Sequence, residues 1–123
     1  LHRTPDGSEH YDLLLQRPAG GRLVTFRLQT SPAGPPPWRL PAERLPDHRE
    51  EYLEFEGDIP GRGCVRRVAR GRCEVEVDHP REFRATVQVK GATGVLVGRD
   101  EDNGLWNLDL RPCALPGQIP AAG

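Results

Sequence analysis

Methionine is absent from the 123 residues, and lysine occurs once, at Lys90, so the 17 basic residues are nearly all arginine. The 18 acidic residues bring the formal net charge to −1 at pH 7. This balance excludes nucleic-acid binding through a protein surface that is basic as a whole, and any such binding has to depend on a local group of arginines. Since the chain begins at Leu1 and holds no methionine, we expect that sequence before Leu1 is missing.

Long apolar segments are also absent. No stretch approaches the roughly 20 apolar residues that a membrane-spanning helix needs, and no signal-peptide pattern occurs. The cysteines, Cys64, Cys73 and Cys113, are odd in number, which argues against a disulfide framework. These absences predict a cytoplasmic protein with reduced cysteines and no contact with membranes.

Long helical patterns are missing too, and short strand patterns take their place. Apolar and polar residues alternate, or apolar residues run together, over short segments separated by residues typical of turns. We expect a hairpin about Gly71 and a short helical turn between Pro41 and Pro46. The strand-like segments are 11–16, 23–29, 52–57, 64–68, 72–77, 82–90, 94–99 and 105–110.

These patterns predict an all-β domain over residues 1–112, a small antiparallel β-barrel of about seven or eight strands with long loops and little helix. Closing the sheet into a barrel would remove its exposed edges. A β-sandwich is the alternative, which the pattern alone does not exclude. Residues 113–123 have the composition of a flexible C-terminal tail.

The first candidate site lies in the segment 8–18. His10 and Asp12 stand two positions apart in a strand pattern, so their side chains point to the same face, roughly 6.6–7 Å apart. An imidazole and a carboxylate suit manganese, zinc or iron(II), and His2 can supply a third ligand if the turn at 4–8 folds it beside His10. The alternative is an ordinary histidine–aspartate hydrogen bond. Leu14 occupies the next position on the same face.

The second candidate site lies in the segment 46–57. His48 and Tyr52 are four positions apart, with Arg44 and Arg49 close by in the sequence. A histidine, a tyrosine hydroxyl and arginines can all donate hydrogen bonds to phosphate oxygens, and a histidine near its titration point can act as a general acid. The alternative is a solvated loop whose tyrosine packs at the rim of the barrel.

Several motifs together resemble a known family. After an initial histidine come "HYDLLLQ" (10–16), "LPDHREEYLEFEGDIP" (45–60), "VRRVARGRCEV" (65–75) and "GLWNLDL" (104–110). This series resembles the 3′-phosphoesterase domain at the N-terminus of bacterial DNA ligase D, and its free-standing relatives, over nearly all of residues 1–111. The most specific parts are the His-Tyr-Asp-Leu tetrad and the block from Asp47 to Gly57.

The resemblance implies a small β-barrel that trims the 3′ ends of broken DNA during DNA repair. It implies manganese dependence, with zinc as the alternative metal, and removal of a terminal ribonucleoside and then of the 3′-phosphate. By motif, His2, His10 and Asp12 match the metal ligands, and His48 and Tyr52 match the residues that act at the phosphate. The expected partners are nucleic-acid 3′ ends and a polymerase or ligase acting in trans, and we expect a monomer.

Two departures from the family pattern bear on these expectations. The spacing from His2 to His10 is two residues longer than in the ligase D pattern, and Leu14 stands where the family has an arginine directed at the substrate phosphate. If the loop at 17–22 places Gln16 opposite Leu23, Arg27 falls opposite Asp12 and can replace that arginine. We therefore expect phosphate contacts from Arg27, with Arg44 and Arg49 as further candidates.

Two functions from different classes follow. The first is a manganese-dependent 3′-end phosphoesterase. The second is a module that binds phosphate or nucleic-acid ends but has weakened or lost catalysis because of Leu14. The near-neutral charge also fits a small phosphoester substrate in place of long DNA, and a purely structural β-barrel is a third reading.

Overall fold

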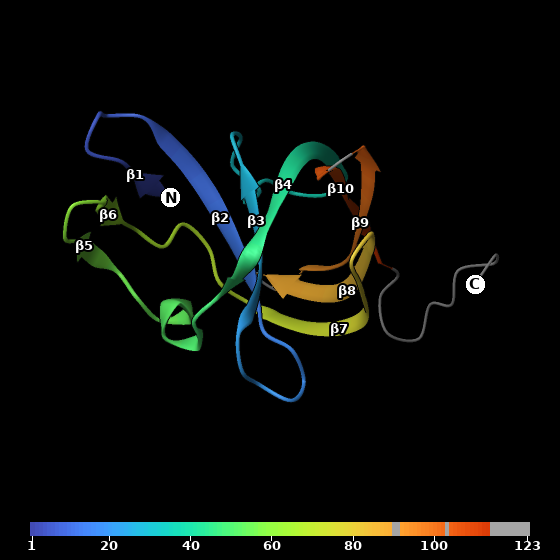
Figure 1. Cartoon of the computed structure of the whole chain (residues 1–123). Helices are drawn as coiled ribbons and strands as arrows, with labels where there is room; N and C mark the ends of the chain where they lie inside the picture. The colour runs from blue at the N-terminus through green and yellow to red at the C-terminus, as the bar shows by residue number, and fades with distance from the viewer. Residues whose placement is uncertain (90–91, 103, 114–123) are drawn as a thin grey trace.

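The computed structural model describes residues 1–89, 92–102 and 104–113 (Figure 1). In this part of the chain a 10-stranded sheet has the order β5-β6-β1-β2-β3-β4-β10-β9-β8-β7, and each pair of neighbours is antiparallel. The strands are β1 (His2–Arg3), β2 (Glu9–Leu15), β3 (Leu23–Leu28), β4 (Trp38–His48), β5 (Gly57–Ile59), β6 (Gly63–Val65), β7 (Arg72–His79), β8 (Glu82–Val89), β9 (Ala92–Asp102) and β10 (Leu105–Pro112), and a 3₁₀ turn, η1 (Glu50–Leu53), follows β4.

The prediction of an all-β, antiparallel fold is confirmed. The sheet is larger than expected, with ten strands, and strand pairing does not close it into a barrel, because β5 and β7 stand at its two ends. The sheet nevertheless curls, since side chains link β7 to the end of β2. Arg17, just after β2, pairs with Asp78 of β7 at 2.6 Å, and the Cys73 thiol donates to the Gln16 carbonyl at 3.5 Å. Side chains therefore hold together two strands that do not pair.

The expected hairpin about Gly71 is wrong. Strand β7 pairs with β8, and β6 pairs with β5 and β1, while residues 66–71 form no strand. A Cβ atom at Gly71 would lie 2.0 Å from the Gln88 carbonyl oxygen, so this glycine allows a close approach to β8 and does not form a turn between strands. The cysteines are free, as expected.

Two local predictions around β4 are also wrong. Residues 41–46 belong to a long strand and contain no helical turn, and the 3₁₀ turn η1 occupies the start of the segment 52–57, which was expected to be a strand. Of the predicted tail, 113–123, only Cys113 lies within the described residues. The tail prediction therefore remains a prediction.

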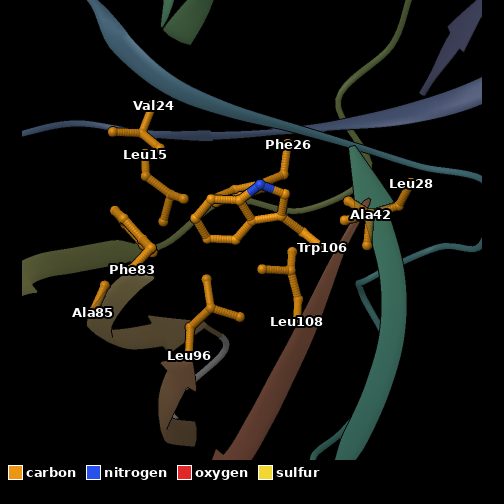
Figure 2. Packing of buried hydrophobic residues seen from close by; sticks show 10 residues of the cluster. All are labelled: Leu15, Val24, Phe26, Leu28, Ala42, Phe83, Ala85, Leu96, Trp106 and Leu108. Carbon is orange, nitrogen blue, oxygen red and sulfur yellow. The ribbon is translucent and has the colours of Figure 1, made fainter. Parts of the chain in front are cut away.

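The core lies on one face of the curled sheet (Figure 2). Alternate residues of β2 and β3 point into it, as the period of two in a strand requires. Phe26 is fully buried, and its ring lies 5.6 Å from that of Phe83 and 5.3 Å from that of Trp106, in edge-on contacts. The buried cluster consists of Leu15, Val24, Phe26, Leu28, Ala42, Phe83, Ala85, Leu96, Trp106 and Leu108. The opposite face of β2 and β3 is left for the candidate site.

Candidate metal and phosphate site

Strand pairing brings His2 and His10 together at the edge of the sheet. In the β1–β2 register His2 lies directly opposite His10, so both side chains point to the face away from the core. Their rings meet edge-on with centroids 4.7 Å apart, and His2 Nδ1 lies 3.1 Å from His10 Nε2. The short turn between the strands, which contains Thr4, Asp6 and Ser8 linked by hydrogen bonds, thus places His2 as the sequence predicted.

Asp12 completes the group, which we call the metal cluster (His2, His10 and Asp12). Asp12 Oδ2 lies 3.5 Å from His10 Nε2, and one ligand atom from each of the three residues lies within 4.8 Å of the others. Ligand atoms held about 2.1 Å from a first-row metal ion lie roughly 3–3.5 Å apart. The His2–His10 and His10–Asp12 separations, 3.1 and 3.5 Å, fall in this range, so the group is a candidate site for a divalent metal, and its ligand atoms suit manganese, zinc or iron.

A hydrogen bond presents one histidine nitrogen, His2 Nδ1, in the form that a metal needs. His2 Nε2–H donates to the Arg62 carbonyl oxygen at 2.7 Å, which leaves the lone pair of Nδ1 facing His10. A bond from the outer ring nitrogen to a carbonyl is the usual way in which a protein orients a metal-binding histidine. At Gly63, φ is +93° and a Cβ atom would lie 1.9 Å from the Arg3 carbonyl oxygen, so only glycine lets the β5–β6 hairpin approach β1 this closely.

His10 is the most buried member of the metal cluster, with an exposed fraction of 8%. Burial lowers the pKa of His10; the Asp12 carboxylate opposes this effect, and the Arg27 charge adds to it. The neutral form of the imidazole, which is the form that binds metal, is therefore favoured.

Arg27 lies beside the metal cluster, as predicted. In the β2–β3 register Asp12 is opposite Arg27, and Leu14 is opposite Thr25. Arg27 Nε lies 3.4 Å from Asp12 Oδ1, the oxygen on the side away from His10, and about a third of the arginine side chain (35%) is exposed. Arg27 thus orients the carboxylate while part of its guanidinium group remains accessible to a ligand.

His48 and Tyr52 form a second group at the end of β4. Their rings lie 6.0 Å apart, edge-on, and Arg49 donates to the Tyr52 hydroxyl at 3.1 Å. His48 Nδ1–H donates to the Pro46 carbonyl at 3.1 Å, which leaves Nε2 free to accept or donate a proton. The predicted neighbours His48, Arg49 and Tyr52 are therefore brought together.

The two groups lie on the same face of the sheet. His48 pairs with Leu23, so its side chain lies on the same face as that of Leu23. Leu23, Thr25 and Arg27 are alternate residues of β3 on this face, and Asp12 shares it because Asp12 pairs with Arg27. Leu23 and Thr25 are fully buried, yet neither belongs to the main core cluster, as expected for residues on the other face. Leu14 thus occupies the row between the metal cluster and the His48 group.

Arg44 is placed elsewhere, which corrects the expectation that it belongs to this site. Leu45 pairs with Thr25, and His48 pairs with Leu23. The step between these two pairs is three residues on β4 but two on β3, so β4 has one extra residue there. This bulge puts Arg44 on the core face, opposite Phe26. Its guanidinium group lies 5.3 Å from the centre of the Trp106 ring and bonds to Asp78 at 2.8 Å.

Sequence reasoning missed one contributor to the site, the Arg62 carbonyl. A backbone oxygen leaves no residue-type signal, and only the glycines on both sides of Arg62 mark a tight turn there.

In the described part of the chain, no helix is long and apolar enough to span a membrane. A scan against protein-family models finds no match, and neither does a search of curated proteins.

Proposed function

We propose that this chain is a metal-dependent phosphoesterase that processes nucleic-acid 3′ ends, as a relative of the phosphoesterase domain of DNA ligase D. The observation that carries the proposal is the convergence of ligand atoms from His2, His10 and Asp12 within 4.8 Å. Arg27 and His48 lie on the same face of the sheet, Tyr52 and Arg49 lie next to His48, and the motifs that resemble the family contain His10, Asp12, His48 and Tyr52. Substrates would be 3′-terminal ribonucleosides and 3′-phosphates.

The metal cluster would hold manganese, or zinc, through two nitrogens and one carboxylate oxygen. The bound metal would act as a Lewis acid toward a phosphate oxygen and lower the pKa of a coordinated water. The Arg62 carbonyl keeps the His2 ring in the orientation in which the lone pair of Nδ1 would face the metal. Arg27 keeps one carboxylate oxygen of Asp12 turned toward His10.

The other residues would bind the phosphate and move a proton. Arg27 and Arg49 would donate to phosphate oxygens, and the Tyr52 hydroxyl would donate to another. His48 would protonate the leaving oxygen from Nε2, because its Nδ1 is already bonded to the Pro46 carbonyl.

Leu14 favours a second function, in which the site binds phosphate ends without turnover. An apolar residue lies in the row between the metal cluster and His48, where a charged donor would be closest to a bound phosphate. A charge-assisted hydrogen bond contributes about 1.5–3 kcal/mol, so its absence can slow the reaction by on the order of 10- to 150-fold. Both functions predict metal binding, and only the first predicts turnover.

The proposal is tested with 5′-labelled primer–templates that end in one 3′-ribonucleotide or in a 3′-phosphate. Each is incubated with manganese, zinc, magnesium or a chelator. We expect loss of the ribonucleoside or phosphate with manganese, none with the chelator, and a decrease of at least about 100-fold in the Asp12→Ala variant, because a metal ligand is removed.

The matched control is Asp109→Ala. The side chains of Asp12 and Asp109 have the same exposed fraction, 19%, and each is paired with an arginine, but Asp109 lies on β10 beside Arg39. Its variant should keep full activity. A folded protein that binds manganese but forms no product with either primer would instead support the binding module.

A further inference from the structure

A cleft beside the His48 group has no role in the chemistry proposed above. It has a volume of about 290 Å³ and lies between η1, the Phe55 side chain and the strand β5 with the turn after it. Its walls combine the aromatic rings of Tyr52 and Phe55 with the apolar side chains of Ile59 and Pro60. This volume is close to the lower end of the range for small-molecule sites, and one nucleobase with its sugar fits it.

The cleft adjoins both halves of the candidate site. The Tyr52 ring lies 6.0 Å from the His48 ring on one side and 5.8 Å from the Phe55 ring on the other. Tyr52 therefore lies between His48 and the cleft. The opposite wall belongs to the β5–β6 hairpin, in which Val65 pairs with both Gly57 and His2. A nucleotide whose phosphate lies between the two groups would therefore have its nucleoside within reach of this cleft.

The polar side chains of the cleft are Arg49, the Tyr52 hydroxyl and two carboxylates, Asp58 and Glu51. Asp58 makes no hydrogen bond or ion pair within the residues that the structure describes, and it is exposed on β5. Glu51, the other carboxylate, is already paired with Arg49 at 3.1 Å. An unpaired carboxylate beside aromatic and apolar walls suits a flat ring that offers N–H donors at its edge.

We infer that this cleft binds the base of the nucleotide that carries the 3′ phosphate, and that Asp58 makes it select guanine over uracil. The base would pack against the Tyr52 and Phe55 rings. Guanine offers two adjacent N–H donors to one carboxylate, whereas uracil offers one donor flanked by carbonyl oxygens that the carboxylate repels. This inference rests on the proposed function, because it assigns the substrate of the same site.

The test compares guanosine 3′-monophosphate with uridine 3′-monophosphate, by calorimetric titration of the manganese-loaded protein. We expect the guanine nucleotide to bind about tenfold more tightly, since a bidentate contact discriminates between bases by roughly 5- to 150-fold. Asp58→Asn should remove the preference for guanine, and Phe55→Ala should weaken the binding of both nucleotides. In parallel, primer–templates whose last nucleotide is a ribo-G or a ribo-U that carries a 3′-phosphate should show the same ratio in kcat/KM for phosphate removal.

Glu82→Gln is the control, because Glu82 is an exposed carboxylate on β8, far along the sheet from β5. It makes the same change in charge and should leave the guanine preference intact. Equal affinity for both nucleotides, or a preference that survives Asp58→Asn, would overturn the inference. If neither primer is processed while the guanine preference and its dependence on Asp58 persist, the proposed reaction fails and the assignment of the cleft stands.

Discussion

Strand β2 has a compact group of titratable side chains at each end, and the two groups differ in how their polar atoms are satisfied. At the end of the strand, Arg17 bonds to Asp78 at 2.6 Å and to Asp47 at 2.8 Å, and Arg44 bonds to Asp78 at 2.8 Å. Each carboxylate thus faces a guanidinium group. We call these four residues the Asp78 cluster.

At the start of the strand, Asp12 also faces a guanidinium group, that of Arg27 at 3.4 Å, but its second oxygen and the two histidines face one another. The nitrogens of His2 and His10 face each other at 3.1 Å, with the Asp12 oxygen 3.5 Å from His10. One of the two nitrogens donates to the other, and a divalent cation that replaced this proton would contact both nitrogens and the carboxylate oxygen. Charge pairing at one end of β2 thus joins the ends of the sheet, whereas the other end gathers two imidazole nitrogens and a carboxylate oxygen into a candidate metal site.

The largest effect is expected when a ligand is removed from the metal cluster. His10→Phe keeps a planar ring of similar size but has no nitrogen, so manganese affinity should fall by about 100-fold or more. The free energy of unfolding in chelator should change by less than about 1 kcal/mol. The phenylalanine ring fills the same buried position, and only the contacts of His10 with His2 and Asp12 are lost. Calorimetric metal titration and urea unfolding measure the two quantities.

His79→Phe provides the control for this substitution, since His79 is exposed at the end of β7. It should leave metal affinity unchanged. Equal manganese affinity in wild type and His10→Phe would show that the three residues form only a hydrogen-bonded group.

The next effect concerns the residue between the two groups of the site. Leu14→Arg places a guanidinium group on the face of Asp12, opposite Thr25. If turnover is limited by the missing phosphate contact, the rate on a 3′-phosphate primer should rise by on the order of 10- to 150-fold, with metal affinity little changed.

Gln16→Arg puts the same group on the same face but roughly 6.6–7 Å further along the strand, so it should give a much smaller increase. An unchanged rate for Leu14→Arg, with tighter binding of inorganic phosphate, would favour the binding module over the enzyme.

The smallest effect is expected on the stability provided by the Asp78 cluster. Asp78→Asn leaves Arg17 and Arg44 without their shared carboxylate and should lower the free energy of unfolding by about 1–3 kcal/mol. Asp109→Asn, beside the largely exposed Arg39, should cost less than about 1 kcal/mol. Neither variant should alter manganese affinity, and a change in metal binding by Asp78→Asn would mean that the two ends of β2 are coupled.

The same cluster gives a pH dependence with a definite sign. Burial alone would raise the pKa of Asp78, but the hydrogen bonds from Arg17 and Arg44 outweigh it and hold this pKa below its usual value of 3.8. A pKa lowered by folding contributes stability that is present above 3.8 and is lost as the pH falls through the pKa of the folded state. As the pH falls below 3.8, the free energy of unfolding should therefore decrease less steeply for Asp78→Asn than for wild type.

The local alternation of residues allowed much of the site to be predicted. Same-face placement of His10 and Asp12 follows from the period of two in a strand, and the position of Arg27 opposite Asp12 follows from the length of the loop between β2 and β3. Phe83 and Ala85, two positions apart on β8, both point into the core for the same reason. These features depend on residues close in sequence.

Features that depend on distant segments were not predictable. Arg44 and His48 are four positions apart, so an unbroken strand would place them on one face, but the bulge in β4 separates them. The segment 66–71 is held by Glu54 and Glu56, through contacts with Arg67 that no local pattern reveals. Ten strands form where fewer were expected because β1 and β5 are too short to show a periodic pattern, and because Pro41 and Pro46 interrupt the pattern of β4.

The sequence by itself determined the all-β class, the faces of β2 and β3, and the residue types of a metal and phosphate site, because side-chain period and ligand chemistry are local properties. Only the tertiary structure decided that the Arg62 carbonyl orients His2, that Arg44 joins the core, and that a cleft opens between η1 and β5. Each of these depends on the close approach of strands far apart in the chain, which packing and a few glycines permit and which no short stretch of sequence specifies.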